Sequence, residues 1–220
     1  GVGVAQVLKS GDDGRQLEWC WRAPNPGSVP KTFQVQGCTE FANAEPTPGR
    51  GPVVMAHRGC CMKGSGFEYA PENTLAAFAY AASVGAHMFE TDLHLTKDGV
   101  IVLLHDSTLD RTTNCSGPVA DLTLAELQSC DAGSWLNESF AGERVPTLVD
   151  AMQLAKKHGM TIILDLKIPG LGPKIKEAML RADFSMADAI PSINLQSDNA
   201  EIVASLSKSA IMVNQKGMMP

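Results

Sequence analysis

Two kinds of periodicity alternate along the chain from residue 53 onward. Short runs rich in apolar residues, typical of strands buried in a sheet, occur at 53–56, 86–92, 100–104 and 161–167. Between them, apolar residues recur at helical spacing after Thr74 and after Thr147, and Gly85 and Gly159 end these two predicted helices. The same order continues with strands at 189–195 and 210–214 and helices at 173–181 and 198–206. Buried strands that alternate with helices predict a parallel sheet with right-handed crossovers.

This alternation predicts an α/β protein, and specifically a (β/α)8 barrel. A closed barrel of eight strands usually takes about 250 residues. Only about six of the eight strand–helix units fit between Val53 and Pro220. We therefore expect residues 53–220 to form a barrel that is incomplete at its C-terminal end.

The first part of the chain follows a different pattern. Residues 1–43 predict an accessory segment of uncertain structure, in which loose alternation at 16–22 and 32–36 allows short strands and several Pro and Gly residues interrupt them. Residues 44–52 have the composition of a linker. The opening residues are too short and too weakly apolar for a signal peptide, and the missing initial Met allows a true N-terminus upstream.

Composition and charge narrow the class of protein. The chain is 44% hydrophobic and 19% charged, which is ordinary for a soluble globular protein. A net charge of −6, without any run of Lys and Arg, argues against a nucleic-acid partner. No apolar stretch approaches the ~20 residues of a transmembrane helix.

Cysteine usage bears on the compartment. The six cysteines show neither CxxC pairing nor zinc-finger spacing, and their even number permits disulfides. Asn-x-Ser sequons lie at Asn114 and Asn137. Together these features favour a secreted or extracellular protein without establishing the compartment. The oligomeric state stays open.

Titratable side chains stand where four successive predicted strands end. In chain order they are His57 and Arg58, Glu90 and Asp92, His105, and Asp165 and Lys167. The carboxyl ends of parallel barrel strands form one face, on which active sites are built. Spacing of i, i+2 turns Glu90 and Asp92 to the same side of their strand, and the same spacing applies to Asp165 and Lys167. Each pair taken alone also fits a salt-bridged barrel rim, but their succession at four strand ends favours a functional site.

Three of these residues predict a metal site. The carboxylates of Glu90, Asp92 and Asp165 would repel one another at a barrel mouth unless a cation lay among them. All-oxygen ligation favours Mg²⁺ or Ca²⁺ over zinc. His94 shares the side of Glu90 and Asp92 and is an alternative ligand. Asp106 lies in a turn, where Asp is expected for its backbone hydrogen bonds, and could also orient the neighbouring His105.

The motifs in this order resemble the glycerophosphodiester phosphodiesterases, which are barrel phosphodiesterases similar to phosphatidylinositol-specific phospholipase C. The matching motifs are His57-Arg-Gly, Pro71-Glu-Asn-Thr, Glu90-Thr-Asp92, Thr96-Lys-Asp-Gly99, His105-Asp106 with Thr108-Leu-Asp-Arg-Thr-Thr113, and Asp165-Leu-Lys167. They cover about residues 53–181. The resemblance is specific because it depends on the whole series and not on any single motif.

The resemblance implies a phosphoric diester hydrolase, a metal-dependent (β/α)8 barrel that converts glycerophosphodiesters to sn-glycerol 3-phosphate and an alcohol. It implies that His57 and His105 are the acid/base pair and that Arg58 and Lys167 bind the substrate phosphate. It also implies that one divalent cation, Mg²⁺ or Ca²⁺, is held by Glu90, Asp92 and Asp165. Such chemistry needs charge neutralisation and two proton transfers, which these residue types supply.

The chain departs from the family pattern in three places. Asp165 stands where the family usually has Glu, the loop between Gly59 and Pro71 is long and contains two adjacent cysteines, and two barrel strands are missing. These departures leave open a non-catalytic or degenerate barrel that acts as a binding module. A related phospholipase D-like barrel enzyme is a further alternative, against which the motif beginning at Pro71 counts.

Overall fold

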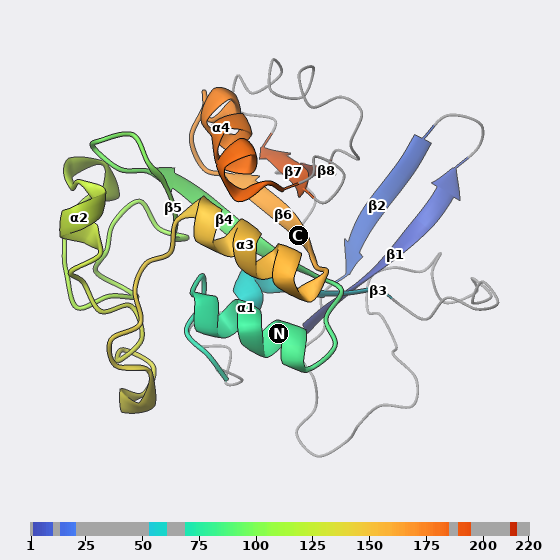
Figure 1. The fold of residues 1–220 in the computed structure, drawn as a ribbon. Coiled ribbons are helices and arrows are strands. Elements are labelled where there is room, and N and C mark those ends of the chain that lie inside the picture. Colours follow the sequence, from blue (N-terminus) through green and yellow to red (C-terminus); the bar gives the residue numbers. More distant parts are fainter. Residues whose placement is uncertain are drawn as a thin grey trace, which may run out of the picture.

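The computed structural model describes residues 53–60 and 69–184, together with the backbones of strands at 2–10, 14–20, 189–194 and 212–214. All described strands belong to one sheet with the order β2-β1-β3-β4-β6-β7-β8, and β5 pairs with β4 (Figure 1). The expected linker at 44–52 and the expected helix at 198–206 lie outside the described residues.

The parallel part of the sheet follows chain order, as the alternation of strands and helices predicts. Each neighbouring pair runs parallel in the series β3 (Val53–Ala56), β4 (Met88–Leu95), β6 (Thr161–Leu166), β7 (Ala189–Asn194) and β8 (Met212–Asn214). The helices between them are α1 (Leu75–Ser83), α3 (Leu148–His158) and α4 (Gly172–Ala182). The protein is therefore a mixed α/β fold with a parallel sheet.

The direction of one predicted strand was wrong. β5 (Ile101–Leu103) pairs antiparallel with β4, so that Leu103 lies opposite Leu93, and it is not a member of the parallel series. A parallel crossover needs a dozen or more residues, and only residues 96–100 separate these two strands. Thr96 closes the hairpin, because its hydroxyl accepts a hydrogen bond from the backbone N of Val100 at 2.9 Å. His105 therefore follows a hairpin strand.

The described N-terminal residues extend the sheet on its other side. β1 (Val2–Ser10) pairs antiparallel with both β2 (Gly14–Cys20) and β3. The alternating stretch expected at 16–22 overlaps β2, and the stretch at 32–36 lies outside the described residues.

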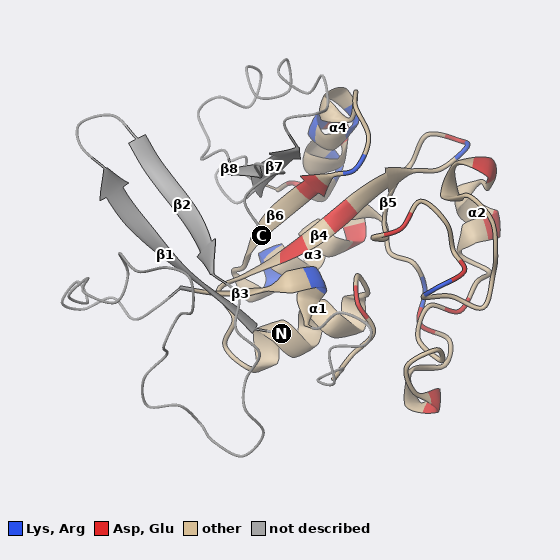
Figure 2. Cartoon of the chain, turned by 180° about the vertical axis from the view of Figure 1, so that it is seen from behind, with Lys and Arg blue, Asp and Glu red and all other residues tan. Residues whose placement is uncertain are grey.

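Alternate residues of β4 and β6 face opposite sides of the sheet, so that one side of these strands is apolar and the other is polar. Phe89 and Leu93 of β4 lie in one core with apolar residues of α1, α3 and α4, and the rings of Phe78 and Phe89 stack at 4.1 Å between centroids. Ile162 and Leu164 of β6 join the same core. Because successive side chains of a strand alternate in direction, the charged residues of both strands point to the opposite side. Figure 2 shows these acidic positions along β4 and at the end of β6.

Side-chain caps set the boundaries of the two best-defined helices. The hydroxyl of Thr74 accepts a hydrogen bond from the backbone N of Ala77 at the start of α1. Thr147 and Asp150 form a capping box at the start of α3, which Gly159 ends in the left-handed conformation at φ 63°. Within the described part of the chain, no helix is long and apolar enough to cross a membrane.

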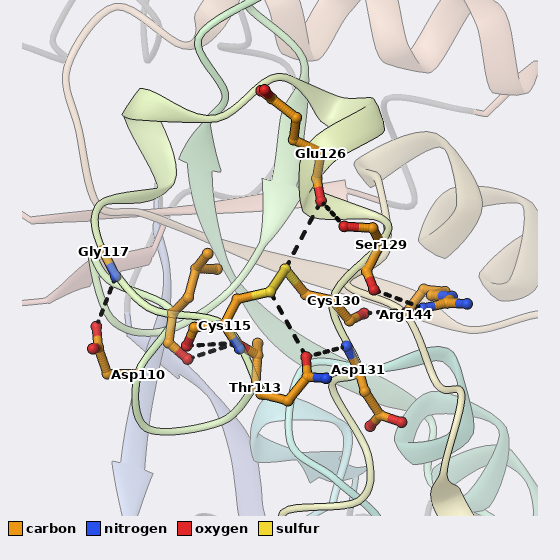
Figure 3. Close-up of a disulfide and its surroundings, with 11 residues drawn as sticks. Asp110, Thr113, Cys115, Gly117, Glu126, Ser129, Cys130, Asp131 and Arg144 are labelled. Carbon is orange, nitrogen blue, oxygen red and sulfur yellow. Dashed lines mark hydrogen bonds between the residues drawn. A yellow bond between two sulfur atoms is a disulfide. The ribbon is translucent and has the colours of Figure 1, made fainter.

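The residues between β5 and α3 form a small unit of their own, here called the connecting segment (residues 105–146). It contains η3 (Val119–Asp121), α2 (Leu124–Leu127) and η4 (Glu138–Phe140). Its apolar side chains form a second core with Val102 and Leu104. A disulfide between Cys115 and Cys130 closes a loop of 15 residues within it (Figure 3). Cys60, outside this segment, is also disulfide-bonded.

Candidate active site

Three carboxylates converge on the polar side of β4 and β6. Asp92 and Asp165 are register partners across the two parallel strands, and Glu90 lies two residues before Asp92. One oxygen of each carboxylate lies within 4.8 Å of the other two. The Asp92 side chain is only 1% exposed and that of Glu90 9%. Burial, followed by the nearby charges of Asp92 and Asp165, raises the pKa of Glu90 well above its usual value.

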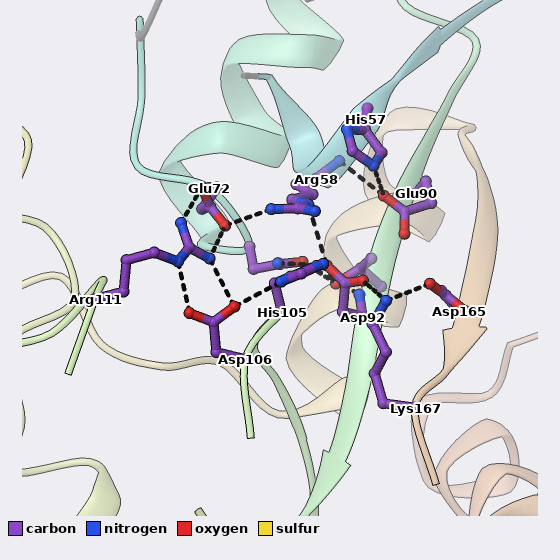
Figure 4. Close-up of polar contacts among 12 residues, drawn as sticks. His57, Arg58, Glu72, Glu90, Asp92, His105, Asp106, Arg111, Asp165 and Lys167 are labelled. Carbon is purple, nitrogen blue, oxygen red and sulfur yellow. Dashed lines mark hydrogen bonds and ion pairs between the residues drawn. The ribbon is translucent and has the colours of Figure 1, made fainter. Parts of the chain in front are cut away.

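Two cations lie against this cluster (Figure 4). The Lys167 Nζ is 2.6 Å from the Asp165 Oδ2 and 2.8 Å from the Asp92 Oδ1. Burial would lower the pKa of Lys167, but the attraction of Asp92 and Asp165 outweighs it and leaves the pKa raised. The Arg58 Nε lies 3.5 Å from the Asp92 Oδ2. Three acidic groups thus face two basic ones on this side of the sheet.

A tight turn after β3 positions His57 and Arg58. Arg58 has a left-handed backbone with φ 53°, and its backbone N donates to the Glu90 Oε2 at 3.0 Å. Gly59 has φ 86°, and a Cβ there would lie 2.5 Å from the Phe78 ring, so only glycine fits. The His57 Nε2 lies 3.5 Å from the Glu90 Oε2. Burial, and then the charge of Arg58, lower the pKa of His57 to about 3.

His105 reaches the site from the connecting segment. Its Nδ1 lies 2.6 Å from the Asp106 Oδ1, and the Arg111 Nε donates to the Asp106 Oδ2, also at 2.6 Å. Hydrogen bonding from Arg111 lowers the pKa of Asp106 to about 2. An ionised carboxylate only accepts hydrogen bonds, so the Nδ1 of His105 is the donor and Nε2 is left for chemistry. Asp106 therefore orients His105, which is the role considered for it from the sequence beside its place in a turn.

The His94 Nε2 lies 3.2 Å from the backbone oxygen of His105. Because a carbonyl oxygen only accepts, Nε2 of His94 is the donor of this hydrogen bond. Among the described residues, the group able to hold a metal consists of Glu90, Asp92 and Asp165 and does not include His94. The structure therefore gives His94 a contact with the connecting segment in place of the alternative role of metal ligand.

Sequence reasoning included Asn73 in the motif that begins at Pro71 but missed its role in the site. Asn73 has φ 58°, a left-handed conformation that Asn tolerates better than most residues. Its Nδ2 donates to the Asp92 Oδ2 at 2.9 Å, and its Oδ1 accepts from the Thr91 hydroxyl at 2.7 Å. Its backbone N donates to the Arg58 carbonyl at 2.9 Å. Asn73 thus holds both Asp92 and the turn after β3.

Glu72 and Arg111 were also missed as members of the site. The Glu72 Oε1 accepts from the Arg58 Nη1 at 2.9 Å and from the Arg111 Nη2 at 2.7 Å. Glu72 is 14 positions from Arg58 and 39 positions from Arg111 in the chain, so no local periodicity connects them. Charged residues within two family-like motifs, those beginning at Pro71 and Thr108, were the available signal.

The fold and the site define a class of protein. It is an α/β protein in which three carboxylates that could hold a metal ion lie on the polar side of the parallel strands, next to two histidines. The sequence model of the Glycerophosphoryl diester phosphodiesterase family matches residues 57–216. The chain belongs to this family. All seven site residues expected from the sequence lie within the matched range, and the structure brings them together in one region.

Individual relatives agree with the family assignment. The Bacillus subtilis protein YhdW is 47% identical over 135 residues, which are 61% of this chain and 53% of that protein. The glycerophosphodiester phosphodiesterase of Caldanaerobacter subterraneus subsp. tengcongensis is 40% identical over 147 residues, covering 64% of this chain and 58% of the relative. The chain therefore spans about half of the length of these curated relatives.

A solved structure gives the same result at the level of the fold. A phosphodiesterase from Oleispira antarctica, in complex with the product sn-glycerol-3-phosphate, is similar with a TM-score of 0.63 and 32% sequence identity. The match covers 75% of this chain and 66% of that one. The glycerophosphodiester phosphodiesterase of Agrobacterium tumefaciens is 30% identical with a TM-score of 0.56, covering 70% of this chain and 61% of that chain.

Proposed function

We propose that this chain hydrolyses glycerophosphodiesters to sn-glycerol 3-phosphate and an alcohol, with the help of one divalent cation. One observation carries the proposal: three carboxylates converge within 4.8 Å beside two histidines, an arginine and a lysine. A phosphodiester anion needs its charge neutralised, its attacking oxygen deprotonated and its leaving alkoxide protonated. The site contains groups for each task.

The donor set fits a hard divalent cation. All three groups are carboxylates, and burial, followed by the nearby charges of Asp92 and Asp165, raises the pKa of Glu90. Glu90, Asp92 and Asp165 would hold the ion, Mg²⁺ or Ca²⁺. When bound, it would supply charge neutralisation at a phosphoryl oxygen. Asn73 would keep the Asp92 carboxylate in its orientation through the 2.9 Å hydrogen bond.

The positions of the other site residues indicate the role of each in binding the phosphate or transferring protons. Arg58 and Lys167 bind the substrate phosphate, since both lie beside Asp92 on the polar side of the sheet. His57 takes a proton from the attacking oxygen. His105 acts as an imidazolium: its Nδ1–H stays bound to Asp106, and the proton on Nε2 passes to the leaving alkoxide, which leaves the neutral ring. This pair acts from two elements, the turn after β3 and the connecting segment.

The parallel strands support a proposal on architecture. We assign β3, β4, β6, β7 and β8 to the part of a (β/α)8 barrel that residues 53–220 would form, preceded by an accessory segment at 1–43 and a linker at 44–52. The support is their chain-order parallel pairing and the likeness to the Oleispira structure. The disulfide between Cys115 and Cys130 supports the further proposal of an oxidising, secreted compartment.

The product formed from glycerophosphocholine tests the activity. We expect release of sn-glycerol 3-phosphate and choline, monitored by phosphorus NMR, in the presence of Mg²⁺ or Ca²⁺. Glu90→Gln should remove the activity, and Glu177→Gln, which changes an exposed carboxylate on α4, should keep it. Formation of phosphocholine, or turnover of lysophosphatidylcholine alone, would contradict the proposed specificity. Substrate binding without any product would favour the non-catalytic binding module.

A further inference from the structure

A buried carboxylate joins the two sides of the site. The Glu72 side chain is 1% exposed, and a carboxylate is buried at low cost only when it is paired. Its partners are two arginines from distant parts of the chain. The Arg58 Nη1 donates to Oε1 at 2.9 Å, and Arg111 donates to both oxygens at 2.9 and 2.7 Å (Figure 4).

Arg111 uses both edges of its guanidinium group. Toward Glu72 it donates from Nη1 and Nη2, and toward Asp106 it donates from Nε at 2.6 Å and from Nη2 at 3.3 Å. A planar group bound bidentately on two edges has one allowed orientation. Asp106 in turn holds the His105 Nδ1 at 2.6 Å. Charged hydrogen bonds thus run without interruption from Glu72 to His105.

His105 needs such a tether because of its place in the fold. It follows the hairpin strand β5 and begins the connecting segment, which has its own core and its own disulfide. His94 holds the backbone oxygen of His105 at 3.2 Å, which fixes the main chain but not the imidazole ring. Glu72 lies just before α1, on the same side as the turn that positions Arg58. The contact between Glu72 and Arg111 therefore fixes, through Asp106, the orientation of the His105 ring relative to the sheet.

We infer that Glu72 and Arg111 are positioning residues for the reaction: through Asp106 they hold the His105 ring, while Glu72 also holds Arg58. The inference rests on the proposed function for its effect on rate, but its geometric content is independent of it. Neither residue needs to touch the substrate. The one carboxylate orients the phosphate-binding arginine and, through Arg111, the acid, so its loss affects both sides of the site.

Kinetics of Arg111→Met against Arg144→Met test the inference. Arg144 is an exposed arginine of the same segment that donates to backbone oxygens of Ser129 and Cys130, and its replacement should leave the rate unchanged. Arg111→Met should lower kcat on glycerophosphocholine by roughly 10- to 100-fold, as for other residues that orient a functional histidine, with a smaller change in KM. The loss should shrink on a p-nitrophenyl glycerophosphodiester, whose leaving group needs no proton.

A double variant tests whether Glu72 acts through Arg111. If both act along one path, Glu72→Gln combined with Arg111→Met should lower kcat little further than Arg111→Met alone. Glu72→Gln should in addition raise KM, because the Arg58 Nη1 loses its charged hydrogen-bond partner, and Arg111→Met should not. Independent, multiplicative effects on kcat would contradict the shared path.

Nitrogen-15 NMR of the imidazole rings separates the inference from the proposed function. At a pH at which the ring is neutral, His105 of the wild type and of Arg144→Met should show one tautomer, with the proton on Nδ1. Arg111→Lys keeps the charge but loses the two-edged fork, so it should fold, lose kcat and show mixed tautomers at His105. Thermal melts identify any variant that does not fold. Unchanged His105 signals and kcat in a folded Arg111→Lys would overturn the inference. A wild type with the expected signals but without hydrolysis would overturn only the proposed function.

Discussion

The two halves of the site differ in how their charges are balanced. In the sheet half, Glu90, Asp92 and Asp165 lie against Lys167 and Arg58, and burial, followed by the charges of Asp92 and Asp165, raises the pKa of Glu90. In the connecting-segment half, Asp106 pairs with Arg111 and His105, and its pKa falls to about 2. The sheet half therefore contains carboxylates that could hold an added cation, and the connecting-segment half is balanced by its own residues.

This difference predicts which functions separate under mutation. Changes in the sheet half should alter the affinity for a cation, because its carboxylates form the only acidic group of this kind within the described residues. Changes in the connecting segment should alter proton transfer or stability while cation binding stays intact. The predictions below compare the two halves, from the largest expected effect to the smallest.

Replacing His105 should have the largest effect. His105→Ala removes the proposed general acid, and turnover of glycerophosphocholine should fall by roughly 10²–10⁴-fold. Cation affinity should stay at the wild-type value, because His105 lies in the other half. Steady-state kinetics and calorimetric titration with Ca²⁺ check the two expectations, with His158→Ala, at the exposed end of α3, as the control. A near-normal rate on this poor leaving group would remove His105 from the role of acid.

Asp165 should tune the cation. Its side chain is shorter than that of Glu by about one C–C bond, ~1.5 Å, which favours the looser shell of Ca²⁺ at ~2.3–2.6 Å over that of Mg²⁺ at ~2.0–2.1 Å. Asp165→Asn should weaken cation affinity by roughly 10- to 100-fold, and Asp165→Glu should keep activity or shift the preference toward Mg²⁺. Titrations that do not differ among the three proteins would take Asp165 out of the site.

The disulfide of the connecting segment should affect stability more than chemistry. A loop of 15 residues between Cys115 and Cys130 predicts a loss of about 3 kcal/mol in the free energy of unfolding when both are changed to Ser. Urea denaturation measures this loss. Under conditions in which the variant is folded, its kcat on glycerophosphocholine should change less than twofold. A large loss of kcat in a folded variant would show that the disulfide also shapes the site.

The smallest effect concerns pH and Asp106. Its pKa in the folded protein, about 2, lies below the usual value of 3.8, so its charge stabilises the fold above about pH 4, and this contribution is lost as the pH falls through 2. The side chain is 30% exposed, and solvent screening keeps the effect within about 1 kcal/mol. The difference in unfolding free energy between wild type and Asp106→Asn should therefore shrink between pH 5 and pH 3. A difference that grows toward low pH would contradict this.

The sheet half was largely predictable from sequence, because strand and helix periodicity act locally. The spacing of Glu90 and Asp92 placed them on one side of a strand, and Asp165 was expected at the end of a later parallel strand. The structure makes that strand the direct neighbour of β4, because the strand predicted between them is antiparallel. Caps at Thr74 and Thr147 marked the starts of α1 and α3. These features depend on residues that are near one another in the chain.

The connecting-segment half was harder to predict. The apolar run at 100–104 gave a strand but not its direction, which the short turn after β4 decides. His105 was found as a candidate from an expected barrel strand that does not exist in that form. Glu72 and Arg111 meet across 39 residues, and only the folded chain shows the contact. Pairing between distant loops leaves no periodic trace in the sequence.

Cation binding and hydrolysis measured in the same samples test the central claim most directly. The metal-free chain would be titrated with Ca²⁺ or Mg²⁺ while bound ion and sn-glycerol 3-phosphate are both quantified. The account predicts that the two rise together, saturate at one ion per chain, and vanish together in Glu90→Gln. Full hydrolysis with no ion bound, or full ion binding by Glu90→Gln, would contradict it.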